Sequence, residues 1–153
     1  MNLIEYKKAR LNYEIIETYE AGLELLGTEV KSLRARQGKI EGAHVVVRPS
    51  GRGGSYEAYI IGMTIPSYQP SNTIKDYDSA RTRRLLLGRK ELAELAGYEH
   101  QKGLTIVPIS VYIKGRNLKL SVAVAKGRKK YDKREALKKR DTEREIERTL
   151  KNN

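Results

Sequence analysis

The chain has 153 residues, a formal net charge of +12 and no cysteine. The lack of cysteine excludes disulfides and thiolate metal sites, and no apolar run approaches the roughly 20 residues that a membrane-spanning helix needs. The N-terminal "MNLIEYKKARLNY" lacks the apolar region of a signal peptide, so we expect a cytoplasmic protein. The excess of basic residues indicates a polyanionic partner without specifying a fold.

Charge density divides the chain at Ala125. Residues 126–153 hold twelve Lys/Arg and six Asp/Glu, whereas residues 1–125 hold nineteen and thirteen. Each part therefore carries +6, but the C-terminal part has almost no apolar side chains with which to pack a core. We predict one domain over 1–125 and a basic tail over 126–153 that is disordered in the free protein and becomes helical on its polyanionic target.

The first predicted elements follow a short helical turn near the N-terminus. Residues 13–20, "YEIIETYE", are typical of a strand, "AG" at 21–22 of a turn and "LELL" at 23–26 of a returning strand. The period then changes, and "GTEVKSLRARQG" predicts a helix of two to three turns that begins after Thr28 and ends at Gly38.

Two β-hairpins and a second helix are predicted in the rest of the domain. "AHVVVRP" and "YEAYIIGM" form a hairpin closed by "SGRGGS", and "LTIVPISVYI" and "LKLSVAVA" form another closed by "KGRN". Between them we expect a surface loop over 66–80 and a helix over 79–96. Arg81, Arg83 and Arg84 would lie at the N-terminus of that helix, where its dipole attracts phosphate.

About six short strands joined by tight turns, without βαβ alternation, favour a mainly β fold. We predict an OB-like closed antiparallel barrel with flanking short helices, an architecture that often binds oligonucleotides.

Catalytic signatures are missing from the sequence. His44 and His100 have no ligand spacing, and no nucleophile elbow or phosphate loop is present. We therefore expect no catalytic residue, no metal, no cofactor and no enzyme activity.

Tyrosines and acids interleave with the basic residues near the N-terminus. A regular strand places Tyr13 and Tyr19 on one face, where, beside Lys7, Lys8 and Arg10, they could stack on bases. Two interpretations of Glu20 and Glu29 stay open. They either balance local charge or accept hydrogen bonds from base amino groups, which phosphates cannot imitate.

Five stretches of this chain together resemble the small protein B (SmpB) family, the SsrA-binding proteins of bacterial trans-translation. They are "YEAG" at 19–22, "GTEVKSLRA" at 27–35, "RTRRLLL" at 81–87, "LTIVPISVY" at 104–112 and "AKGRKKYDKRE" at 125–135. Their order and spacing fit from Lys8 to Leu150. The resemblance implies an OB-like barrel that binds the tRNA-like end of transfer-messenger RNA and delivers this RNA, alanine-charged and carried with elongation factor Tu, to stalled ribosomes.

The resemblance also implies site residues. The RNA-facing surface is expected at Tyr13, Glu20, Gly22, Glu29, Lys31, Arg83 and Leu86. The tail is expected to occupy the vacant decoding centre of the small subunit and the messenger path, through Lys129, Tyr131, Asp132, Lys133, Arg134 and Leu150. The expected molecule is a monomer without a membrane partner.

The chain departs from the family pattern at several positions. The family commonly has asparagine at Tyr6, histidine at Leu11, an aromatic residue at His44 and a polar residue at Gly88, and its "DP" is here Asp78-Ser79. Two other hypotheses are kept. One is a structural ribosomal or initiation-factor-like OB module bound to ribosomal RNA, and the other is a nuclease or RNA-modifying enzyme, which would need paired carboxylates or metal.

Within the tail, the spacing of charges predicts a helix. Asp132 and Glu135 form a D-x-x-E capping box at its expected start. Basic residues recur at i, i+4 and i+8, with acids beside them: Arg140, Arg144 and Arg148, and Glu143 and Glu147. Its apolar residues are few, so we expect the helix to need a target.

Overall fold

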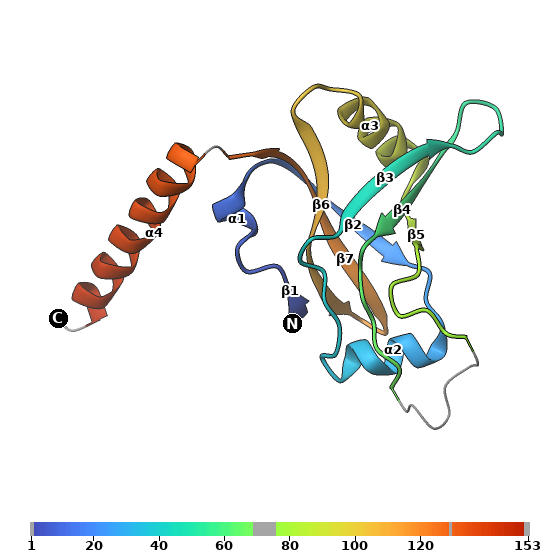
Figure 1. Cartoon of the computed structure of the whole chain (residues 1–153), viewed down its shortest axis with the longest axis horizontal. Helices are drawn as coiled ribbons and strands as arrows, with labels where there is room; N and C mark the ends of the chain where they lie inside the picture. The colour runs from blue at the N-terminus through green and yellow to red at the C-terminus, as the bar shows by residue number, and fades with distance from the viewer. Residues whose placement is uncertain (1, 69–75, 129, 152–153) are drawn as a thin grey trace.

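A computed structural model describes residues 2–68, 76–128 and 130–151, with the backbone alone described for 130–136, 150 and 151 (Figure 1). Seven strands form one antiparallel sheet in the order β1-β6-β7-β2-β5-β4-β3. Their bounds are Asn2–Glu5 (β1), Tyr13–Leu23 (β2), His44–Pro49 (β3), Tyr56–Ile61 (β4), Arg83–Leu86 (β5), Leu104–Lys114 (β6) and Asn117–Gly127 (β7). The helices are Ala9–Asn12 (α1), Gly27–Arg34 (α2), Arg89–Glu99 (α3) and Lys130–Lys151 (α4).

The mainly β prediction and both hairpins are confirmed, but the sheet is not a closed barrel. Its edge strands β1 and β3 are not paired with each other. The sheet curls far enough for β3 to lie beside β6. The Glu99 carboxylate of α3 accepts a hydrogen bond of 2.5 Å from the Val47 backbone N–H. A side chain thus satisfies a donor that a neighbouring strand would take in a closed barrel.

The core lies inside this curled sheet. The inner faces of the strands contribute residues such as Ile60, Leu120 and Val122, which are fully buried. Helices α2 and α3 lie toward opposite ends of the sheet (Figure 1), and each inserts one leucine, Leu33 and Leu95 respectively, with no exposed surface. The two helices therefore complete the core without covering the outer face of β2 and β5.

The predicted turn at residues 21–22 is wrong, because β2 runs through Ala21 and Gly22 to Leu23 as one strand. Both residues pair with β7 and are buried. The short strand β1 was also not predicted. The first internal helix has the predicted length of two to three turns but starts and ends earlier, since α2 spans Gly27–Arg34 and begins after Leu26 rather than after Thr28.

The predicted helix over 79–96 is also wrong in its first half. Residues 83–86 form β5, in which Arg83 and Leu85 are buried while Arg84 and Leu86 are exposed. That alternation has the period of a strand. Helix α3 begins only at Arg89, where Glu91 accepts a 3.1 Å hydrogen bond from the Gly88 backbone N–H. The arginines therefore do not lie at a helix N-terminus.

A bulge in β2 changes which side chains share a face. The pairing with β7 shifts between Ile15 and Glu17, which leaves Ile16 as the extra residue. Tyr13 consequently packs on the outer face, whereas Tyr19 packs against the inner core. The predicted Tyr13–Tyr19 platform is wrong, because it assumed a regular strand.

The tail carries helix α4, which projects away from the sheet and contacts α1 (Figure 1). The helix begins at Lys130. Asp132 therefore lies in its first turn rather than at the predicted cap. Among the described residues, no helix has both the length and the apolar character that crossing a bilayer requires.

Candidate nucleic-acid interface

A row of residues crosses the outer face of four adjacent strands. The register pairs Leu86 with Gly22, Gly22 with Lys119, and Lys119 with Tyr112. Leu86 is 51% exposed. Gly22 is buried beneath it, since a Cβ atom at Gly22 would lie 3.2 Å from the Leu86 Cβ. We call Leu86, Gly22, Lys119 and Tyr112 the outer row.

An open hollow of about 230 Å³ lies at the outer row, between β2, β5, the β6–β7 turn and α2. Its apolar side is formed by Val30 and Leu86 together with neighbouring leucines, and its basic side by Arg116 and Lys119. The Arg34 guanidinium donates a 3.2 Å hydrogen bond to the Arg116 carbonyl, which joins α2 to the turn. A hollow with apolar and cationic walls suits a nucleotide, whose base is flat and whose phosphate is charged.

Glu20 lies on the same outer face, diagonal to the outer row. Its carboxylate accepts hydrogen bonds from the Tyr112 hydroxyl and, at 2.9 Å, from Lys114 Nζ. These two bonds lower the pKa of Glu20, and burial followed by the bond to Glu20 raises the pKa of Tyr112 to about 12. Glu20 is thus a charged acceptor, held in place and open to solvent.

Glu29 is buried and forms the centre of a second group of side chains. Its carboxylate accepts hydrogen bonds from Arg81, from Arg83 Nε at 2.8 Å and Nη2 at 2.6 Å, and from the Leu26 backbone N–H at 2.8 Å. The Tyr77 hydroxyl lies 3.0 Å from Glu29 Oε2 and 2.7 Å from the Ile65 carbonyl. We call Glu29, Tyr77, Arg81 and Arg83 the buried cluster.

Arg83 is completely buried and fully occupied inside the protein. Besides Glu29, its guanidinium donates to the carbonyls of Met63 at 2.8 Å, and of Arg81 and Ser79, each at 3.0 Å. Glu29 is 1% exposed. The expected direct contact of these two residues with RNA is therefore corrected, because neither offers surface to a ligand. They join α2, the segment around Ser79 and β5 beneath the outer row.

The buried cluster favours the charged form of Glu29. Burial alone would raise the pKa of this carboxyl, but hydrogen bonds from Arg81, the Leu26 backbone and Arg83 lower it to about 2. For Glu29, charge balance is thus the interpretation that the structure supports.

The bulge places Tyr13 on the same outer face as Glu20 and Gly22, but at the far end of β2. Gly22 lies nine positions after Tyr13, and at about 3.3 Å per residue this corresponds to roughly 30 Å along the strand. Tyr13 packs edge-to-face on Tyr6, with ring centroids 6.5 Å apart. Asn12 Nδ2 donates a 2.7 Å hydrogen bond to the Tyr6 hydroxyl. Tyr13 is therefore far from the other residues predicted to face RNA. Glu20, Gly22 and Leu86 lie close together, and Lys31 is exposed on the neighbouring α2.

A sequence model of the SmpB protein family matches residues 3–152. The chain belongs to the SmpB family.

Relatives within this family agree with the match along nearly the whole length. The SsrA-binding protein of Gloeothece citriformis is 44% identical over 97% of this chain and 92% of the relative. That of Clostridium acetobutylicum is 43% identical over 99% and 93%. A solved structure, described as "tmRNA-SmpB: a journey to the center of the bacterial ribosome", contains a chain 40% identical, with a TM-score of 0.63 over 88% of this chain and 93% of that chain.

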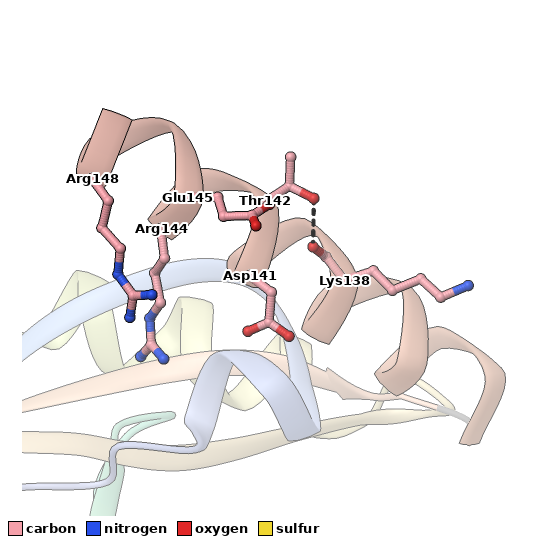
Figure 2. Close-up of a pocket in the computed structure, with 6 residues that line it drawn as sticks. All are labelled: Lys138, Asp141, Thr142, Arg144, Glu145 and Arg148. Carbon is pink, nitrogen blue, oxygen red and sulfur yellow. Dashed lines mark hydrogen bonds between the residues drawn. The ribbon is translucent and has the colours of Figure 1, made fainter. Parts of the chain in front are cut away.

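The tail of this SmpB-family chain presents a basic helix surface. Figure 2 shows Arg144 and Arg148 extending side by side from α4, one helical turn apart. Its apolar side chains Leu137 and Ile146 are 39% and 54% exposed. Lys129 lies outside the described residues. Tyr131, Asp132, Lys133, Arg134 and Leu150 lie in α4, where the structure describes their backbone.

Several residues of the outer face were missed at the sequence level. Lys119, Tyr112, Lys114 and Arg116 surround the hollow or hold Glu20. The predicted hairpin around "KGRN" contained the signal, since counting outward from the turn pairs Tyr112 with Lys119. Within the described ranges, no group of three or more His, Cys, Asp or Glu side chains is placed to hold a metal ion.

Proposed function

We propose that this chain binds transfer-messenger RNA and delivers it to stalled bacterial ribosomes for trans-translation, as an adaptor rather than an enzyme. The observation that carries the proposal is the outer row. In a chain of the SmpB family, it combines an exposed leucine, a hollow and basic side chains on one uncovered sheet face. Relatives are named SsrA-binding protein, and the description of the similar solved structure names tmRNA, SmpB and the bacterial ribosome.

Each part of the outer face has a chemical task in this proposal. Leu86 packs against a base or ribose that leaves the RNA stack. Glu20 accepts from a base amino group, because its charge is held by Tyr112 and Lys114 without being covered. Lys31, Arg116 and Lys119 contact phosphates and fix the register of the RNA. Such an arrangement corresponds to an OB-like surface, on which strands bind an oligonucleotide.

The buried cluster contributes indirectly. Val30 follows Glu29 and lines the hollow, while Leu86 lies three residues after Arg83 on β5. By fixing α2 against β5, Glu29 and Arg83 set the width of the hollow without touching RNA. Gly22 contributes in a similar way, since its missing side chain lets Leu86 lie flat against β2.

The tail has a separate task on the ribosome. We expect α4 to enter the decoding centre and the messenger path that stand empty on a stalled small subunit. Its basic side chains would meet ribosomal RNA there, and the Tyr131 ring would stack on a base. Elongation factor Tu is an indirect partner through the RNA. The proposed protein is a cytoplasmic monomer that needs no cofactor.

Deleting residues 128–153 tests this division of tasks. We expect near-normal binding of isolated transfer-messenger RNA and loss of peptide tagging on stalled ribosomes. A matched variant replaces Asp132, Lys133 and Arg134 by alanine, which lowers the net charge by one and should have the same effect. A truncated protein that tags normally would contradict the proposed role of the tail. Loss of both activities would reduce the tail to a nonspecific anchor.

A further inference from the structure

A second hollow, of about 520 Å³, lies beside the outer row at the start of α3. Three arginines from three separate elements line it: Arg52 from the β3–β4 turn, Arg84 from β5 and Arg89 from α3. The turn reaches beyond the sheet toward the side on which α3 lies (Figure 1). Three arginines that are far apart in the sequence therefore line one space. We call this space the arginine hollow.

The charges of the arginine hollow are only partly balanced. Glu57 is the one acidic residue that lines it among the described residues. Its Oε1 lies 3.7 Å from Arg84 Nη2, and its Oε2 accepts a 2.6 Å hydrogen bond from the Tyr59 hydroxyl. Arg89 donates weakly, at 3.4 Å, to the Gly53 carbonyl. Within the described part of the chain, neither Arg52 nor Arg89 forms an ion pair, so the lining keeps an excess of two positive charges.

The floor of the arginine hollow is apolar and half-buried. Tyr56, Leu87 and Leu92 form it, and all three pack against the main core. The hollow is therefore part of the folded domain rather than a gap between mobile side chains. Its arginine side chains stay at the rim, and the Arg84 side chain is 48% exposed.

The arginine hollow lies next to the outer row. Arg84 and Leu86 both point to the outer face of β5, as the alternating burial of that strand requires. Two residues of a strand span about 7 Å. An RNA chain that packs on Leu86 therefore reaches the arginine hollow without leaving the surface.

We infer that the arginine hollow binds the phosphodiester backbone of the same RNA whose nucleotides pack on the outer row. Guanidinium groups bind phosphate oxygens through paired, charge-assisted hydrogen bonds, and Arg52, Arg84 and Arg89 present such donors from three directions. This inference rests on the proposed RNA binding and extends its surface across β5 to α3 and the β3–β4 turn. The single carboxylate, Glu57, orients Arg84 without cancelling the other two charges.

The test is the salt dependence of binding to transcribed transfer-messenger RNA by the full-length double variant Arg84→Gln/Arg89→Gln. Each lost phosphate contact should reduce the slope of log K against log salt by about one unit, so we expect a reduction of about two. The matched control, Lys39→Gln/Lys102→Gln, removes the same charge from exposed residues that line neither hollow. Its slope should stay within about half a unit of the wild-type value.

Leu86→Asp, measured in the same experiment, separates this inference from the proposed function. A double variant with the slope of the lysine control overturns the inference. If Leu86→Asp then still weakens binding, the outer row binds RNA without the arginine hollow. If Leu86→Asp also binds like wild type, the proposed RNA face fails with it. Cooperative thermal melting of every variant confirms that the exposed substitutions leave the fold intact.

Discussion

The outer row and the buried cluster come from the same short elements yet have opposite surroundings. On β5, Leu86 is 51% exposed, whereas Arg83, three residues earlier, has no exposed surface. On α2, Glu29 is buried while the next residue, Val30, lines the hollow. The exposed side chains make contacts that a ligand can use, and the buried ones make contacts only within the protein.

This difference separates two ways in which a residue can matter for binding. Removing an outer-row side chain takes away area or charge from the interface and leaves the core intact. Removing a member of the buried cluster leaves an unpaired charge inside the protein, which affects folding first. The two regions should therefore respond differently to substitution when stability and affinity are measured on the same variant.

Glu29→Gln should have the largest effect. The glutamine keeps the size of the side chain but leaves the buried Arg83 without its counter-charge, which typically costs about 3–5 kcal/mol of unfolding free energy. Urea unfolding measures this loss. The control is Glu20→Gln, whose ion pair with Lys114 is exposed to solvent and should contribute little to the unfolding free energy. Equal losses in the two variants would contradict the distinction between the regions.

Acid should weaken the buried cluster in the wild-type protein. The folded-state pKa of Glu29, about 2, lies below the 4.5 of a free glutamate. A lowered pKa contributes stability that is complete above pH 4.5 and is lost as the pH falls toward 2. The contribution is on the order of 3 kcal/mol. Urea unfolding between pH 6 and pH 3 should therefore show a steeper decline for wild type than for Glu29→Gln, and parallel curves would exclude this origin.

Local patterns in the sequence predicted the hairpins, because apolar alternation and a glycine-containing turn act within a few residues. They did not predict β5. The run "RTRRLLL" places four polar residues before three leucines and so shows no alternation. The signal that decides between helix and strand is the burial of Arg83, which depends on Glu29 more than fifty residues away. A nonlocal ion pair of this kind cannot be inferred from spacing.

The candidate site was predictable to a similar extent. The resemblance grouped Glu20, Gly22 and Leu86, which lie close together on the outer face, whereas residue spacing alone would have grouped Tyr19 with Tyr13. The bulge at Ile16 reverses that assignment, and nothing in "YEIIETYE" marks it. The arginine hollow unites residues from a turn, a strand and a helix, so only the folded chain could reveal it.

Leu86→Ala should weaken RNA binding while leaving stability nearly unchanged. About half of the side chain is available for burial by RNA, which corresponds to about 1 kcal/mol, or a roughly fivefold loss of affinity. Gel-shift titration at moderate salt measures it. The matched control is Leu26→Ala, because Leu26 is 39% exposed and does not line the hollow. If Leu86→Ala binds normally, or if its melting transition collapses, Leu86 is not an RNA contact.

Gly22→Ala should have the smallest effect and test how the row is built. The new Cβ would lie 3.2 Å from the Leu86 Cβ, so the leucine must move by a few tenths of an ångström. Because Leu86 is half exposed, it can yield, and we expect a stability loss below about 1 kcal/mol. The displaced leucine should lower RNA affinity less than Leu86→Ala does. Gly127→Ala on β7 is the control, since no atom lies within 4 Å of its added Cβ.

In the double variant Gly22→Ala/Leu86→Ala the added methyl group has less to displace, so the two losses of affinity should not add. Additive losses of affinity would mean that Gly22 affects RNA binding in some way other than by setting the position of Leu86.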